Sequence, residues 1–342
     1  MRKAKALKGF NNFLAGKHAR IVRGGRGARQ VFCVMSLWGI GRSSWGGYPG
    51  GVDETVQLKS SMAVVRDHSR HFSDFTFVYP VISRRSRGLS IGINVNPDKV
   101  CNFDCIYCEV DRRVPGAVTE VDLSQMRDEL RAMIGFARDG GLAKEPKFDE
   151  VPGMTREIRD IAFSGDGEPT MIHNFDEVVE AVAEEKISAG LHDTKIVLIT
   201  DAAGLDKASV RRGLEVMDAN EGEVWGKLDA GTEEFFKMVN RTSVKFQRVL
   251  DNLRDTARAR PILIQSLLLK VHGEPMSAAE LEAYCGRLND ITAAGGQIRG
   301  VQAYTVARPT PEAFATKLTK EELEAMAVVI RERTGLPVET YE

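Results

Sequence analysis

Cysteine is scarce in this chain, with five residues among 342. Three of the five fall within eight residues, and the other two, Cys33 and Cys285, stand far from them and from each other. This usage excludes the disulfide framework of a small secreted domain. We therefore expect a reducing compartment, and the cytoplasm is the predicted location.

Long apolar runs are also absent, since none approaches the ~20 residues that a membrane span requires. A secretory signal is not expected either, because the initial basic region is too long and no small-residue cleavage site is clear. The net charge of −1 is unevenly spread. Residues 1–61 hold 11 Lys+Arg and 2 Asp+Glu, which leaves 36 and 46 for residues 62–342. A basic arm thus precedes an acidic body.

Residues 1–61 are predicted to be an extension, and residues 62–342 a single α/β domain. The first 30 residues are rich in Arg, Lys and Gly without a sustained period. Composition favours a disordered tail, or translated upstream sequence with the true start at Met62. The alternative is an arm that clamps an RNA backbone, because Lys and Arg neutralise phosphates.

The chemistry of the chain is concentrated in Cys101, Cys105 and Cys108, which follow the spacing C-x₃-C-x₂-C. Thiolates are the usual ligands of iron–sulfur clusters, and three ligands leave one iron of a cubane [4Fe–4S] cluster open to a small molecule. A structural zinc site would need a fourth ligand, and a distant histidine such as His71 or His173 could supply it. The polar neighbours of the three thiols argue against inert core cysteines. The spacing therefore favours a [4Fe–4S] cluster.

Cys101, Cys105, Tyr107 and Cys108 resemble the C-x₃-C-x-aromatic-C loop of the radical S-adenosylmethionine (radical SAM) enzymes. The resemblance runs from about Tyr79 to the C-terminus. It implies two cofactors, a [4Fe–4S] cluster and S-adenosyl-L-methionine, whose amino and carboxylate groups chelate the open iron. It further implies an electron donor such as flavodoxin or ferredoxin, and cleavage to methionine and a 5′-deoxyadenosyl radical that abstracts hydrogen from a substrate. Tyr107 matches the position that lies by the adenine.

A second motif, Ser164-Gly-Asp-Gly-Glu-Pro-Thr170, resembles the Gly-Gly-Glu-Pro segment of the same family. The resemblance implies that Gly165, Asp166, Gly167 and Glu168 bind the ammonium group of S-adenosylmethionine. Glycine permits close approach of the backbone, and a carboxylate suits a cation. The additional Asp166 leaves open whether it or Glu168 meets the ammonium. Another Gly-Glu-Pro, at 273–275, lacks the paired glycines and is predicted to be a loop.

Alternating strand and helix patterns fill the body of the chain. Six strands are predicted, over residues 90–95, 158–164, 195–200, 223–229, 262–269 and 298–305, and residues 338–341 form a possible edge strand. Capping boxes at Ser277 and Thr319 begin two of the intervening helices. Six β-α pairs in series imply parallel strands. We expect an open (β/α)₆ partial TIM barrel, which is also the fold that the resemblance implies, with its chemistry at the C-terminal strand ends.

Polar residues at those strand ends are weaker candidates for the site. Thr200, Lys227, Asp229 and Gln265 are predicted to contact the cofactor, and Gln302, Tyr304 and Arg308 the substrate. Lys227 and Asp229 form an ion pair in the alternative interpretation, and Gln265 is then a structural amide. Cys285 lies in a helical pattern and is interpreted as a core thiol.

The finer details look most like the wyosine-related group of radical SAM enzymes. They are Ser-Arg-Arg-x₃-Leu-Ser (83–90), Lys-Leu-Asp-Ala (227–230) and Gln-x-Tyr-Thr-Val-x-Arg (302–308). This resemblance implies a tRNA guanine as the substrate, although the further cluster cysteines of the wyosine-forming enzymes are missing. A glycyl-radical activating enzyme, acting on a protein, is an alternative. A zinc- or cluster-stabilised nucleic-acid-binding module without catalysis is another.

Overall fold

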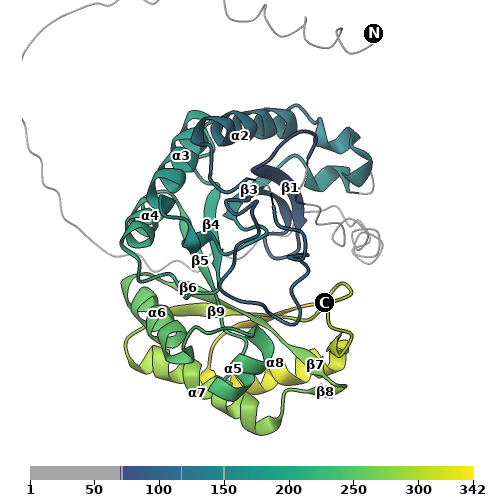
Figure 1. The fold of residues 1–342 in the computed structure, drawn as a ribbon, viewed down its shortest axis with the longest axis vertical. Coiled ribbons are helices and arrows are strands. Elements are labelled where there is room, and N and C mark those ends of the chain that lie inside the picture. The colour runs from purple at the N-terminus through teal and green to yellow at the C-terminus, as the bar shows by residue number, and fades with distance from the viewer. Residues whose placement is uncertain (1–69, 71, 117, 149–150) are drawn as a thin grey trace, which may run out of the picture. The chain divides into compact units, whose positions relative to one another are not determined.

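The computed structural model describes residues 70, 72–116, 118–148 and 151–342. The described part forms a curled sheet with helices along its outer side (Figure 1). The predictions for residues 1–61, which include Cys33, lie outside the described residues, and so does His71.

The main sheet has eight strands in the order β1-β2-β3-β4-β5-β6-β9-β11. They are β1 (Val78–Ser83), β2 (Gly88–Ile93), β3 (Ile158–Phe163), β4 (Lys195–Thr200), β5 (Gly222–Lys227), β6 (Ile262–Leu267), β9 (Ile298–Tyr304) and β11 (Val338–Tyr341). All neighbours are parallel except β1 and β2. The predicted (β/α)₆ partial barrel is therefore confirmed, and so is the edge strand at its end.

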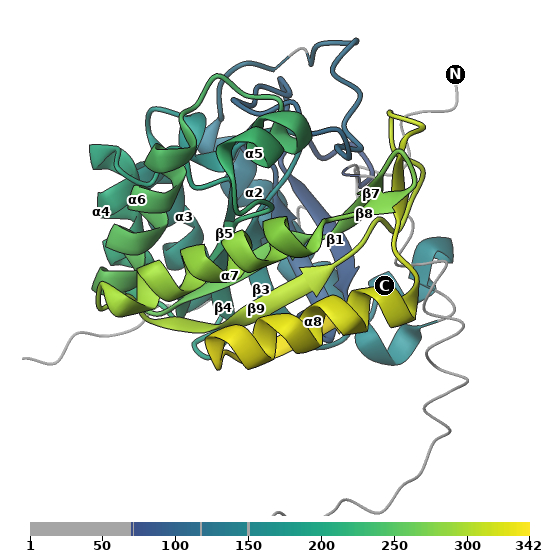
Figure 2. The same ribbon diagram turned by 90° about the horizontal axis from the view of Figure 1, so that it is seen from below.

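Helices connect successive parallel strands and cover the convex face of the sheet, as Figures 1 and 2 show from two sides. They are α2 (Leu123–Arg138), α3 (Phe175–Ser188), α4 (Ala208–Asp218), α5 (Glu233–Asn240), α6 (Phe246–Ala259), α7 (Ala278–Ala293) and α8 (Lys320–Thr334). Short 3₁₀ turns occupy Leu142–Lys144, Pro146–Phe148, Pro152–Met154 and Pro169–Met171. None of the helices in the described ranges is both long and apolar enough to cross a membrane.

The sheet begins earlier than the sequence pattern indicated. The first predicted strand starts at residue 90, whereas the structure pairs β1 with β2 as an antiparallel hairpin. Pro80 interrupts the strand pattern, but β1 is an edge strand, where a residue without an N–H group is tolerated. The carboxylate of Glu129 on α2 accepts three backbone N–H bonds, at 2.7 to 3.1 Å, from residues 76–78 at the start of the strand.

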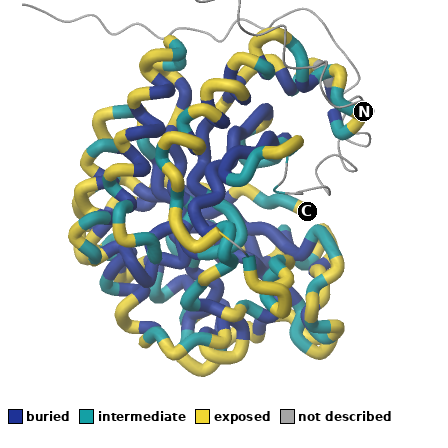
Figure 3. The backbone as a smooth tube through the Cα atoms, turned by 45° about the horizontal axis from the view of Figure 1, so that its top comes forward, coloured by how far each residue is buried: buried dark blue, intermediate teal, exposed yellow. Residues whose placement is uncertain are grey.

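The strands are buried on both faces, which explains why apolar residues predominate in their sequences. Figure 3 shows the dark blue of buried residues concentrated along the strands and yellow on the outer turns of the helices. The outer face belongs to the large core shared with the helices. The inner face carries a small cluster of Ala162, Val197 and Trp225. Because this cluster occupies the inner face, the polar side chains that point inside the curled sheet lie near the strand ends.

Two local predictions were altered by tertiary contacts. The capping box at Thr319 forms with both of its hydrogen bonds. At Ser277 only the first half forms, because the carboxylate of Glu280 instead accepts the backbone N–H groups of Gly231 and Thr232 at 2.5 and 3.0 Å. Residues 273–275 are not a plain loop. They turn the chain from β7 (Leu269–Val271) into β8 (Glu274–Pro275) of a small sheet that β10 (Ala315–Lys317) completes.

Candidate functional site

A cavity of about 320 Å³ opens at the C-terminal ends of the parallel strands. Its walls come from the cysteine loop, the turn after β3, the ends of β4, β5, β6 and β9, and the β1–β2 hairpin. Twelve predicted site residues line it: Cys101, Cys105, Tyr107, Cys108, Gly165, Gly167, Glu168, Thr200, Lys227, Gln265, Tyr304 and Arg308. Asp166, Asp229 and Gln302 are not among the lining residues.

The cysteine loop is anchored by the C-terminal end of α5. Carbonyl groups in the last turn of a helix have no partner within the helix. Here the carbonyl oxygens of Val239 and Asn240 accept hydrogen bonds from the N–H groups of Ile106 and Asp104, at 2.9 and 3.1 Å. A helix far along the sequence thus fixes the backbone between the first and third cysteines.

Each sulfur of the loop has a hydrogen-bond donor beside it. Arg112 Nη1 lies 3.1 Å from Cys108 Sγ, Asn240 Nδ2 lies 3.4 Å from Cys105 Sγ, and the N–H of Phe103 lies 3.5 Å from Cys101 Sγ. Burial, followed by nearby Asp201, raises the pKa of Cys101 to about 12. Burial likewise raises the pKa of Cys105 to about 11. Without a metal these thiols are protonated at neutral pH, so metal binding must displace their protons.

The donor set fits an iron–sulfur cluster, because three thiols with N–H donors beside them face one cavity. Within the part of the chain that the structure describes, no three His, Cys, Asp or Glu side chains are grouped to hold a single metal ion. A cubane does not require that grouping, since each thiolate binds a different iron atom.

The two glycines of the second motif are needed for packing against the protein itself. A Cβ on Gly167 would lie 1.9 Å from the carbonyl oxygen of Val100, and one on Gly165 would lie 2.3 Å from Asn94 Oδ1. The N–H of Glu168 also donates to the carbonyl of Val100 at 3.1 Å. Close approach was predicted for a ligand, whereas the structure shows it between this turn and the segment before the cysteine loop.

The two carboxylates of this turn have different surroundings. Asp166 is held by Arg70 Nη1 at 2.6 Å and by Asn94 Nδ2 at 2.8 Å. Glu168 is 3% exposed, and its carboxylate accepts bonds from the N–H and hydroxyl of Thr170, the hydroxyl of Thr200 and the N–H of Asp201, at 2.6 to 3.1 Å. Glu168 therefore organises the end of β4, and it alone of the two lines the cavity.

Lys227 and Asp229 leave β5 in different directions. Asp229 is buried and accepts bonds from the Tyr107 hydroxyl, from Asn240 Nδ2 at 3.1 Å and from the N–H of Leu267 at 2.9 Å. It therefore positions the cysteine loop from outside the cavity. Lys227 lines the cavity, with its Nζ 5.3 Å from the centre of the Tyr107 ring.

The remaining strand-end residues form two groups. Gln265 and Gln302 are buried side by side, with a 3.2 Å hydrogen bond between their amides. Tyr304 lines the cavity, and so does Arg308, which pairs with Glu109. Cys285 lies in the main core, which confirms its interpretation as a core thiol.

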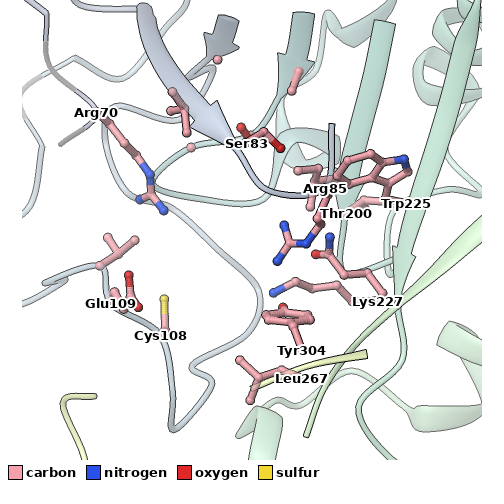
Figure 4. A pocket seen from close by; sticks show the side chains of 18 of the residues that line it. Arg70, Ser83, Arg85, Cys108, Glu109, Thr200, Trp225, Lys227, Leu267 and Tyr304 are labelled. Atoms are coloured by element: carbon pink, nitrogen blue, oxygen red, sulfur yellow. The ribbon is translucent and has the colours of Figure 1, made fainter. Parts of the chain in front are cut away.

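Sequence reasoning missed four arginines that line the cavity, namely Arg70, Arg84, Arg85 and Arg112. Figure 4 shows Arg70 on the side of Cys108, and Arg85 with its guanidinium near the ends of Lys227 and Tyr304. The Ser-Arg-Arg sequence at 83–85 was noted only as a group resemblance. The concentration of positive charge between two strands was the sequence feature that could have predicted these cavity residues.

Comparisons with known proteins agree with this geometry. The profile of the Radical SAM superfamily matches residues 95–281, which include both motifs. Two curated relatives are "GTPase Obg" of Brachyspira hyodysenteriae (26% identical, covering 72% of this chain and 32% of the relative) and a UPF0026 protein of Methanocaldococcus jannaschii (29% identical, 47% and 43%). The chain thus spans less than half the length of either relative.

A solved structure with the same fold is SuiB of Streptococcus suis bound to S-adenosylmethionine. The TM-score is 0.50 at 12% identity, and the match covers 76% of this chain and 52% of that chain. At this identity the likeness concerns the fold alone.

Proposed function

Since the chain belongs to the Radical SAM superfamily, we propose that it cleaves S-adenosylmethionine reductively at a [4Fe–4S] cluster held by Cys101, Cys105 and Cys108. The superfamily uses both cofactors. The observation that carries the proposal is the shared cavity: the three cysteines line it together with Glu168 and the ends of β4, β5 and β6.

The protein's contribution is orientation. When bound, the cluster supplies the electron and S-adenosylmethionine the 5′-deoxyadenosyl group that abstracts hydrogen. The end of α5 fixes the thiols, and Tyr107, held by Asp229, would offer its ring to the adenine. Glu168 would offer negative charge to the ammonium, and its burial and its four donors hold the carboxylate in place. Asp166 is neutralised by Arg70, so Glu168 is the better acceptor.

The substrate is proposed to be a tRNA base. The motif resemblance at 83–90, 227–230 and 302–308 supports this choice, and a basic arm suits an RNA backbone. Tyr304 and Arg308 are the proposed substrate contacts, while Gln302 orients Gln265. A low-potential donor such as flavodoxin or ferredoxin would supply the electron, and the few cysteines suit the reducing cytoplasm.

The direct test is product analysis of the full chain after anaerobic reconstitution and reduction with dithionite. We expect slow formation of 5′-deoxyadenosine and methionine from S-adenosylmethionine, even without the true substrate. S-adenosylhomocysteine as the sole product would indicate methyl transfer instead. A fully loaded, reduced cluster that yields no 5′-deoxyadenosine would contradict the proposal.

Arg112 is expected to tune the cluster. Its guanidinium donates to Cys108 Sγ and also to the carbonyls of Lys99 and Asp166, at 3.1 to 3.4 Å, so it is fixed beside the ligand. A cation and an N–H donor favour the more negative, reduced state of a cluster. We expect Arg112→Met to lower the reduction potential by roughly 60 mV, a tenfold change in a one-electron equilibrium. The measurement is a redox titration followed by electron paramagnetic resonance.

Arg113→Met is the matched control, because the Arg113 side chain is 90% exposed and pairs with Asp111. Its potential should stay within experimental error of the wild type. An equal shift in both variants would mean that general charge, rather than the bond to Cys108, sets the potential.

A further inference from the structure

Four acidic side chains line the cavity, and each accepts at least one hydrogen bond or ion pair. Besides Glu168 with its four donors, Asp160 accepts from the hydroxyl of Ser90 at 2.5 Å, and Glu109 pairs with Arg308. Asp201 Oδ1 accepts from the N–H of Ala203 at 2.9 Å, whereas Asp201 Oδ2 is buried without a hydrogen-bond partner among the described residues. None of these carboxylates forms an ion pair with the remaining cations that line the cavity, which are Arg84, Arg85 and Lys227.

Arg85 is the most unusual of these cations. Its Nε is buried without a hydrogen-bond partner, and among the described residues no carboxylate lies within the 4.0 Å of an ion pair. A desolvated charge without a partner is costly in a folded protein. An anionic ligand would supply the missing partner and offset this cost.

The described residues around Arg85 fix the position of its guanidinium but do not accept hydrogen bonds from its N–H groups. Its guanidinium carbon lies 4.5 Å from the centre of the Tyr304 ring, so one flat face is stacked. Stacking leaves the in-plane N–H groups free, and two parallel N–H groups match the two oxygens of a carboxylate or phosphate. Figure 4 shows the guanidinium, the Lys227 ammonium and the Tyr304 ring facing the same space.

Like charges lie near Arg84. Burial, Arg85 and Arg308 together lower the pKa of Arg84, and burial lowers the pKa of Arg85. The hairpin turn that carries both arginines lies against the far edge of the sheet, where Arg87 Nη2 is 3.9 Å from Glu339 Oε1 of β11. An anion bound between these groups would relieve their repulsion.

We propose that Arg85, with Arg84 beside it, binds an oxyanion of the substrate, either a phosphate or a carboxylate. The inference rests on the proposed function, in which substrate and S-adenosylmethionine share this cavity. The cofactor is a poor occupant of the position, because its sulfonium and ammonium groups are cationic and, in the proposed function, its carboxylate would be used on the open iron. The oxyanion would therefore hold the substrate at the β1–β2 side of the cavity, away from the cysteine loop.

The test is calorimetric titration of reconstituted full-length enzyme, saturated with S-adenosylmethionine, with inorganic phosphate and separately with acetate. Wild-type enzyme should bind one of them saturably, and the one that binds identifies the substrate group as phosphate or carboxylate. Arg85→Gln should weaken that binding at least tenfold, which is the loss expected for a charge-assisted pair. Arg87→Gln removes the same charge from the same turn, but its side chain is 78% exposed, so binding should stay within about twofold.

Three results would overturn the subsite: no saturable binding of either anion, equal losses in both variants, or competition between the anion and S-adenosylmethionine. If Arg85→Gln does not fold, Arg84→Gln must show a loss of several-fold, and an unchanged affinity overturns the subsite equally. Formation of 5′-deoxyadenosine is measured in the same samples. Its presence without anion binding contradicts only the subsite, whereas its absence contradicts the proposed function.

Discussion

Alanine in place of Cys101, Cys105 or Cys108 is expected to remove the cluster and all formation of 5′-deoxyadenosine. Reconstituted wild-type protein should hold about four irons per chain, as a cubane requires. Each cysteine is one of three ligands on a single loop, and among the residues that the structure describes no other cysteine lines the cavity. A missing thiolate therefore has no replacement within that part of the chain. Iron and sulfide analysis, the absorption spectrum and product assays of each variant provide the measurement.

Cys285→Ala is the matched control. This thiol belongs to α7 and is 2% exposed in the main core, so its loss should cost some thermal stability and leave the iron content unchanged. Stoichiometric zinc without iron uptake in wild-type protein would contradict the cluster and support the non-catalytic binding module. Full iron content in any of the three loop variants would show that the ligand assignment is wrong.

Replacement of Glu168 by glutamine is expected to weaken binding of S-adenosylmethionine by about 10- to 100-fold while iron content is retained. The loss of a hydrogen bond to a charged group costs about 1.5 to 3 kcal/mol, and each 1.4 kcal/mol is tenfold in affinity. All four partners of this carboxylate are donors. A glutamine amide would place its own NH₂ group against either the Thr170 or the Asp201 backbone N–H, so the end of β4 must also shift. Equilibrium binding to the reconstituted protein measures the effect.

Glu223→Gln separates this effect from a general loss of stability. Glu223 is 6% exposed and also holds several donors, namely Lys195, Trp225 and Arg299, but it does not line the cavity. Its replacement should lower the melting temperature and leave the affinity for S-adenosylmethionine within about threefold. Equal losses of affinity in both variants would show that Glu168 does not bind the cofactor directly.

The fold class and the location of the site along the chain could be predicted from local sequence patterns. Strands such as Lys195–Thr200 are apolar on both faces, and this pattern follows from burial between helices and barrel interior, so it can be recognised locally. The cysteine spacing and the Gly-Asp-Gly-Glu turn are equally local, because both lie within a single loop. The capping box at Thr319 formed as predicted, since its two hydrogen bonds join residues three apart.

The pairing of polar side chains, in contrast, could not be predicted from the sequence and depends on how the chain folds. Glu280 accepts the N–H groups of Gly231 and Thr232 instead of completing its predicted capping box. Asp229 accepts from Tyr107 and Asn240 rather than facing the cavity. Arg70 donates to Asp166, which lies 96 residues further along the chain. Such bonds join side chains that are distant in the chain, and their energies depend on burial and on competing partners that no local pattern encodes. For the same reason the position of Arg85 beside Tyr304 emerged only from the curl of the sheet. That curl brings the β1–β2 hairpin against the edge formed by β9 and β11.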